Sequence, residues 1–169
     1  MSNDNNSIIC LNINKVRDFI SSLFKDEYPT CLFSGVLQLN DYQEALEQSK
    51  AMPIKIFVGI DGTPEFERID PLLFERVDTL PFLFNVKISW IVTILADRKR
   101  IGMPTIIQKI DEIVNTIRRE IGSRYFVKEN YADSPTNLED SGILTDVGTR
   151  DAELFQRNIA WQQRFRVAI

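Results

Sequence analysis

The stretch that decides the fold is residues 84–95, FNVKISWIVTIL, in which every even position from Phe84 to Ile94 is apolar. Polar residues occupy the positions between them, and only Ile91 interrupts the alternation. Because successive side chains of a β-strand point to opposite faces, this period of two predicts a strand that buries one side. Such a strand needs another element to cover its apolar side.

The covering element is predicted by the next apolar pattern, which has the spacing of an α-helix. Pro104 suits the first helical turn because its missing N–H has no partner there, and Gly122 is a typical helix end. Between them, one apolar stripe predicts a helix that packs on the sheet. The stripe consists of Ile106, Ile107, Ile110, Ile113, Val114, Ile117 and Ile121.

Further patterns predict the rest of the domain. A second alternation runs over residues 54–60 and stops at Asp61-Gly62, a strong turn pair. Apolar residues at odd positions of 159–169 predict a closing strand. The other predicted segments are a helix over 13–24 capped by Asn12 or Asn14, a strand over 31–39, a short helix over 42–50, a short strand at 125–127 and a mobile loop over 130–150.

Because these elements alternate along the chain, we predict an α+β fold: a mostly antiparallel β-sheet with the long amphipathic helix and the N-terminal helix packed on it. Residues 1–11 are predicted to be a flexible N-terminal extension and residues 12–169 a single domain. Trp90 and Trp161 stand at apolar strand positions, so we expect them in the core rather than as a platform for stacked bases.

The composition indicates a soluble protein from a reducing compartment. The chain has 169 residues, a net charge of −4, and two cysteines, Cys10 and Cys31, in apolar surroundings typical of buried thiols. The polar start does not resemble a signal peptide, and the longest apolar run is about half of a membrane span. The basic clusters at 98–100 and Arg118-Arg119 are expected to be a solvated turn and a favourable helix end, with nucleic-acid contact as the alternative.

The sequence contains no histidine, which removes the commonest general base and the commonest metal ligand. The segment 59–62 lacks the spaced glycines and the lysine of a phosphate-binding loop, and Asp140 and Asp146 around Gly142 lack calcium-loop spacing. We therefore expect no enzyme, no catalytic residue, no cofactor and no bound metal. A magnesium site is the alternative to solvated loop charge for the acids Asp61, Glu65, Glu67, Asp70, Glu75 and Asp78.

The connection over residues 63–81 is too apolar for a free solvent loop, although it contains three prolines. Long connections of this kind are usually functional or bound to a partner, and a large exposed apolar patch usually marks an interface. Arg164 and Arg166 share the outward face of the last strand. They are either plain surface residues or partners of acids on another subunit.

Seven segments of the chain together suggest a family. They are the helix Ile13–Phe24, the strand Cys31–Leu39, DYQEA at 41–45, MPIKIFV at 52–58, Phe84–Leu95, the helix Ile106–Ile121 and WQQRFRV at 161–167. In this order they resemble the tail-terminator (tail-completion) proteins of tailed bacteriophages and related contractile particles. The resemblance covers most of the chain, and the apolar connection 63–81 and the polar N-terminal extension depart from it.

The resemblance implies a structural virion protein, present in the tail or neck and assembled in the host cytoplasm. A homohexameric ring would cap the head-proximal end of the tail tube, end tail polymerisation and provide the head-joining surface. Its partners would be its own copies, tube and sheath subunits and head-neck connector proteins, with DNA as passing cargo and no membrane. The predicted oligomer-interface residues are Phe66, Leu72, Leu73, Phe74, Arg164 and Arg166.

Other classes of protein fit the same residues. Another neck or tail connector component would be equally free of catalytic groups. A cytoplasmic adaptor would use the apolar connection to dock a protein partner, and a metal-dependent nuclease would use the acids of residues 61–78. Native mass separates these classes, because a sixfold species favours the terminator and a monomer favours the adaptor or the enzyme.

Overall fold

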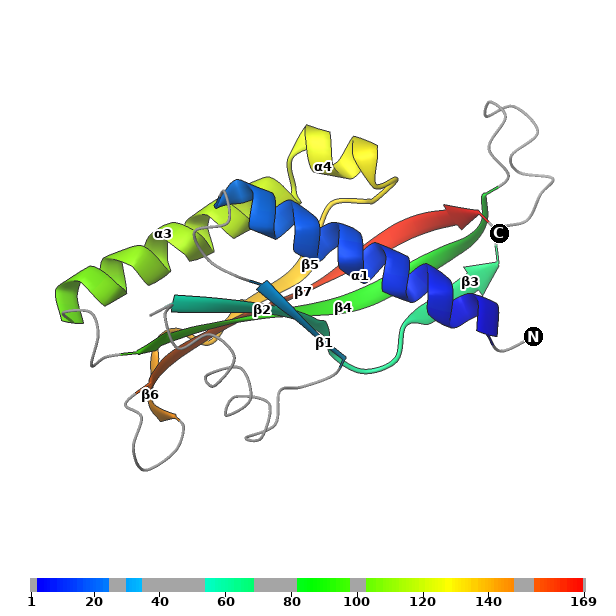
Figure 1. Cartoon of the computed structure of the whole chain (residues 1–169). Helices are drawn as coiled ribbons and strands as arrows, with labels where there is room; N and C mark the ends of the chain where they lie inside the picture. The colour runs from blue at the N-terminus through cyan, green and yellow to red at the C-terminus, as the bar shows by residue number, and fades with distance from the viewer. Residues whose placement is uncertain are drawn as a thin grey trace.

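Two long antiparallel strands, β4 (Phe82–Asp97) and β7 (Leu154–Ala168), form the centre of the fold (Figure 1). They pair along nearly their whole length, with Trp90 opposite Trp161. β4 contains the alternating stretch from which the fold was predicted. The computed structural model describes residues 3–24, 30–34, 54–68, 82–97, 103–147 and 154–168.

Five shorter strands extend this pair into a seven-stranded sheet with the order β1-β2-β4-β7-β5. All pairings are antiparallel except that of β1 with β2, which is parallel. β3 also pairs with β4, and β6 with β7. The predicted α+β class with a mostly antiparallel sheet is therefore confirmed. The shorter strands are β1 (Thr30–Ser34), β2 (Ile54–Ile60), β3 (Glu65–Arg68), β5 (Thr136–Asp140) and β6 (Leu144–Val147).

Three helices lie on the same side of the sheet: α1 (Asn3–Leu23), α3 (Met103–Ile121) and α4 (Arg124–Glu129) (Figure 1). Ser123 caps the start of α4: its Oγ accepts a hydrogen bond from the N–H of Phe126 at 3.2 Å. We call the side of the sheet with Trp90 and Trp161 the inner face, and the opposite side the outer face.

The inner face and the helices share one hydrophobic core. Trp90 and Trp161 are both buried, as predicted, with ring centroids 6.4 Å apart, and Phe165 packs edge-on against Trp90. The predicted stripe of α3 is buried except at Ile107, which is 39% exposed. Ile107 was wrongly placed in the stripe because neighbouring residues point about 100° apart around a helix, and Ile106 already faces the core.

The outer face differs from the one-sided burial that the alternating pattern predicts. Ser89 and Lys87 are partly exposed, but Thr93, toward the other end of β4, is buried, and so is every residue of β2. Thr93 is satisfied by a hydrogen bond from its Oγ1 to Oδ1 of Asn158 at 2.9 Å. A period of two therefore identified the inner face correctly but could not tell where the outer face is covered.

The N-terminal helix begins at Asn3, not at Asn12 or Asn14. Residues 3–11, predicted to belong to a flexible extension, are therefore part of α1. The physical reason is visible in the sequence, since Ile9 stands four residues before Ile13 and continues the helical spacing upstream. α1 therefore runs through the predicted boundary between residues 11 and 12.

The segment after α3 also corrects two predictions. Residues 125–127, predicted as a short strand, lie in α4, and the predicted mobile loop 130–150 contains β5 and β6. Both strands pair with the edge of β7, a partner that a reading of local composition could not supply. The predicted helix 42–50 and most of the connection 63–81 lie outside the described residues.

Candidate functional site

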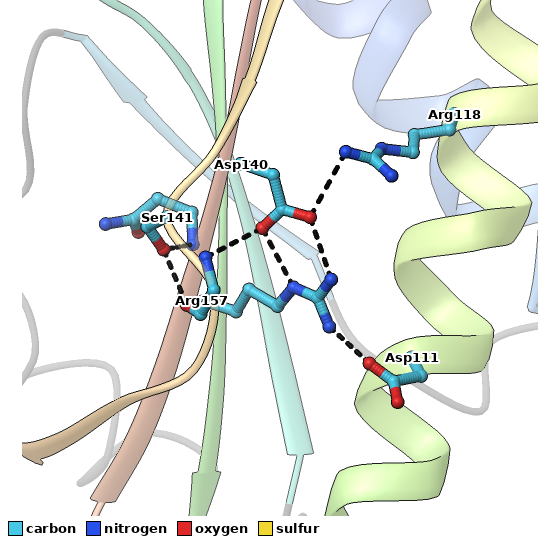
Figure 2. A network of polar contacts seen from close by, with 7 residues as sticks. Asp111, Arg118, Asp140, Ser141 and Arg157 are labelled. Carbon is cyan, nitrogen blue, oxygen red and sulfur yellow. Dashed lines mark hydrogen bonds and ion pairs between the residues drawn. The ribbon is translucent and has the colours of Figure 1, made fainter.

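Charged side chains gather where α3 passes over the β5–β7 side of the sheet (Figure 2). Arg157 is at the centre, and its Nε and Nη2 donate to the two carboxylate oxygens of Asp140 at 2.9 and 2.8 Å. Its Nη1 donates to Asp111 on α3. Arg118, also on α3, completes the group with Nη2 at 3.2 Å from Oδ2 of Asp140. We call these four residues the arginine–aspartate network.

The fold explains why these four residues meet. Asp140 is opposite Ile159 in the sheet, so Arg157, two residues earlier on the same face of β7, is its diagonal neighbour. Asp111 and Arg118 are seven residues apart and therefore lie on one side of α3, two turns apart. The network holds the polar side of α3, next to the apolar stripe that enters the core, to strands β5 and β7.

A tight turn fixes the position of the Asp140 carboxylate. The N–H of Gly142 donates to Oδ1 of Asp140 at 2.9 Å, and Gly142 has a φ of +67°, which glycine adopts without strain. Ser141 exchanges hydrogen bonds with the backbone of Asn158, with its N–H donating at 3.0 Å and its Oγ accepting at 2.9 Å (Figure 2). The carboxylate is therefore held before any helix contact is counted.

The network is electrically balanced, with two carboxylates and two guanidinium groups. The hydrogen bonds from Arg157 lower the pKa of Asp140 to about 2 from its ordinary value of 3.8, against the opposing effect of burial. The N–H of Gly142 lowers this pKa further, and the hydrogen bonds with Asp140 raise the pKa of Arg157. Since each charge already has a partner, we assign the network to stability rather than to substrate binding.

Replacing Asp140 by asparagine is expected to lower the free energy of unfolding by about 2 kcal/mol at neutral pH. A carboxyl group whose pKa is lower in the folded state stabilises the fold above its unfolded pKa of 3.8, and this contribution is lost as the pH falls toward about 2. The stability difference between wild type and Asp140→Asn should therefore shrink over that interval. Urea unfolding at a series of pH values measures it.

The matched control for this experiment is Glu139→Gln on the same strand. Glu139 is exposed and is opposite Ala160 on the outer face. Glu139→Gln should therefore change the free energy of unfolding by less than about 0.5 kcal/mol. A wild type and an Asp140→Asn variant that lost stability in parallel on acidification would contradict the stabilising role of the carboxylate.

A second polar cluster lies inside the core around Gln163. Its Nε2 donates to the carbonyl oxygens of Ile121 at 3.2 Å and Asp133 at 2.9 Å, and its Oε1 accepts from Nε1 of Trp161 at 3.1 Å. Gln163 thereby joins the last turn of α3, the segment before β5 and the central strand. In contrast, the buried Nε1 of Trp90 has no hydrogen-bond partner in the described part of the chain.

The structure places three of the six predicted interface residues. Phe66 is on β3 and is 37% exposed, and Arg164 and Arg166 are exposed on β7. Phe66 is opposite Val86 on the inner face, whereas both arginines are on the outer face, so the structure does not unite them on one surface. Leu72, Leu73 and Phe74 lie outside the described residues.

The alternative magnesium site gains no support from the acids that can be placed. Asp61, Glu65 and Glu67 are exposed, and among the described residues no three acidic, cysteine or histidine side chains are grouped to hold a metal ion. A hollow of about 570 Å³ lies between α1, α3 and α4. It contains charges of both signs from Lys15 and Glu120.

None of the described helices is long and apolar enough to cross a membrane.

Two important residues were missed by sequence reasoning although a signal was present. Arg157 and Gln163 are polar residues at odd positions of β7, where Phe155, Trp161 and Phe165 are buried. A polar residue in the inward phase of a strand needs a buried partner, so both positions indicate internal hydrogen bonds.

Comparison with known protein families and with curated proteins found no match to this sequence.

Proposed function

We propose that the protein is a structural component of a tailed phage or a related contractile particle. As a tail terminator, it would form a homohexameric ring on the head-proximal end of the tail tube, stop the addition of tube subunits and offer a surface for the head-neck connector. In this proposal it is not an enzyme, binds no cofactor and resides in the virion.

The observation that supports this proposal is that polar side chains between the helices and the sheet are satisfied internally, whereas others are left exposed. The arginine–aspartate network and Gln163 are satisfied internally and hold helix to sheet, while Phe66, Arg164 and Arg166 are exposed at one end of the sheet. A rigid unit that leaves apolar and charged side chains exposed can assemble into a ring through contacts between unlike surfaces. The element order of the resemblance also agrees with the observed α1, β2, β4, α3 and β7.

Native mass spectrometry and electron microscopy of the purified protein test the proposal. We expect a sixfold species and closed rings, and we expect added protein to shorten the tubes formed by polymerising tail-tube subunits. A protein that stays monomeric at high concentration and leaves tube length unchanged would favour the adaptor class instead.

A double variant tests the apolar residues that are predicted to form part of the contact between subunits. Leu73→Ser combined with Phe74→Ser is expected to give a folded monomer, because the two apolar side chains proposed for the contact between subunits are then lost. Tyr125→Ser is the matched control, since this aromatic side chain is 68% exposed on α4. Light scattering distinguishes the two outcomes, and a ring that persists in the double variant would refute this role for the connection.

A further inference from the structure

One end of the sheet separates opposite charges onto opposite edges. At this end the described sheet consists of β3, β4 and β7, so two strand spacings, roughly 10 Å, separate β3 from β7. Glutamates occupy the outer face of β3, and arginines occupy the outer face of β7. The two outer-face rows, read from β3 across β4 to β7, are Glu65–Lys87–Arg164 and Glu67–Asn85–Arg166.

Most of these charges have no ion-pair partner within the described part of the chain. Lys87 approaches Glu65 at 3.8 Å, which is a long ion pair at an exposed site. Arg164 and Arg166 have no ion-pair partner among the described residues, and neither has Glu67. Arg164 is directly opposite Lys87, and like charges directly opposite in a sheet are destabilising. A counter-charge supplied by a second molecule would remove that repulsion.

The backbone of β7 at this edge is already occupied, which restricts how a partner can bind. The N–H of Arg166 donates to the carbonyl of Tyr131 at 2.9 Å, and the N–H of Asp133 donates to the carbonyl of Arg164 at 2.8 Å. A partner therefore meets side chains and cannot extend the sheet along this stretch. Beside the cations is a hollow of about 170 Å³, lined by Lys87, Asp133, Ser134, Thr136, Gln163 and Arg164.

We propose that Glu65 and Glu67 of one copy of this chain pair with Arg164 and Arg166 of the next copy. The two surfaces are unlike and complementary in charge, so repetition of the contact builds a chain of subunits that can close into a ring. The inference rests on the proposed assembly function and adds to it the identity of the paired residues. Phe66, between the two glutamates in sequence, points to the inner face and is not part of this contact.

A second copy fits this surface better than a nucleic acid does. The three cations Lys87, Arg164 and Arg166 are matched by three acids, Glu65, Glu67 and Asp133, within the same end of the sheet. A polyanion binds by neutralising many phosphates at once, and a surface with no net charge offers it little. The acidic strip on β3 of one copy instead complements the basic strip on β7 of a neighbouring copy.

Two charge-reversed chains test the proposal. One carries Arg164→Glu and Arg166→Glu, and the other carries Glu65→Arg and Glu67→Arg. Each alone should self-associate at least about tenfold more weakly than wild type, because like charges then face one another across the contact. An equal mixture should recover association, as should a single chain with all four changes. Native mass and sedimentation at low and high salt give the readout.

Controls keep the outcome interpretable. Arg124→Glu with Lys128→Glu makes the same change in charge on α4 and should leave association unchanged, since these residues are exposed on another element. The neutral variants Arg164→Gln with Arg166→Gln repeat the test without new repulsion and should weaken association less. Circular dichroism confirms that each chain is folded.

The possible results separate this inference from the proposed function. Rings that form equally well in both reversed chains would overturn the pairing while leaving the terminator function intact. A wild-type protein that never self-associates would overturn both. Charge-reversed chains that weaken separately but do not recover when mixed would show that the residues do not pair with each other. Binding of duplex DNA that is lost in Arg164→Glu with Arg166→Glu, without any change in association, would assign the arginines to nucleic acid instead.

Discussion

Replacing Trp161 by alanine is expected to lower the free energy of unfolding by about 4 kcal/mol. The side chain is 1% exposed, stacks against Trp90 across the central strand pair and donates a hydrogen bond to Gln163. Its removal leaves a large cavity in the middle of the sheet and deprives Oε1 of Gln163 of its donor. Chemical denaturation followed by circular dichroism measures the change.

Three further variants define the cause of that loss. Tyr125→Ala removes an aromatic ring that is 68% exposed, so its effect should stay below about 0.5 kcal/mol. Trp161→Phe keeps most of the ring volume but loses the indole N–H, and it should be more damaging than Trp90→Phe, whose buried N–H has no partner in the described residues. Equal losses in the two phenylalanine variants would show that the hydrogen bond to Gln163 contributes nothing.

The second large effect is expected at Gln163. Gln163→Leu should lower the free energy of unfolding by about 3 kcal/mol, because it leaves the buried N–H of Trp161 and the carbonyl groups of Ile121 and Asp133 without their partner. The volume of the side chain hardly changes, so the loss reports on hydrogen bonding rather than on packing. Native-state hydrogen exchange should show faster opening where α3 ends against the segment before β5.

The neighbouring residue provides a control for Gln163. Gln162 is on the outer face, and its Oε1 accepts from Asn137 at an exposed site, so Gln162→Leu should cost less than about 1 kcal/mol. A Gln163→Leu variant as stable as Gln162→Leu would refute the structural role of the buried amide. Because Trp161 and Gln163 are in contact, the double variant Trp161→Ala with Gln163→Leu should lose less than the sum of the two single losses.

Local patterns were sufficient for the central elements of the fold. The alternation in β4, the odd-numbered apolar positions of β7 and the stripe of α3 each reflect a periodicity that the backbone imposes on neighbouring residues. The burial of Trp90 and Trp161 follows from the same alternation. Errors arose where a partner distant in the sequence decides the structure, as for β5 and β6, which are strands because they pair with β7.

The candidate site was less predictable than the fold. Arg118 was expected to complement the end of a helix, with nucleic-acid contact as the alternative, and Asp140 was noted only because its segment lacks the spacing of a calcium loop. The pairing of Asp140 with Arg157 depends on the register of β5 on β7, and the pairing of Arg118 with Asp140 depends on how α3 passes over these strands. The odd positions of Arg157 and Gln163 in the alternating pattern of β7 could have identified them as buried polar residues. The same pattern could not have identified their partners.

The sequence by itself determined the inner faces of β4 and β7 and most of the buried stripe of α3, because strand and helix periods are properties of the backbone that act over a few residues. Only the tertiary structure decided which charges meet. Arg157 reaches Asp140 and Asp111 across separations of 17 and 46 residues. Strand register decided that Phe66 and Arg164 lie on opposite faces while Glu65 shares the face of Arg164. A shift of register by one residue reverses every side chain of a strand, so these assignments belong to the pairing of strands and not to any single segment.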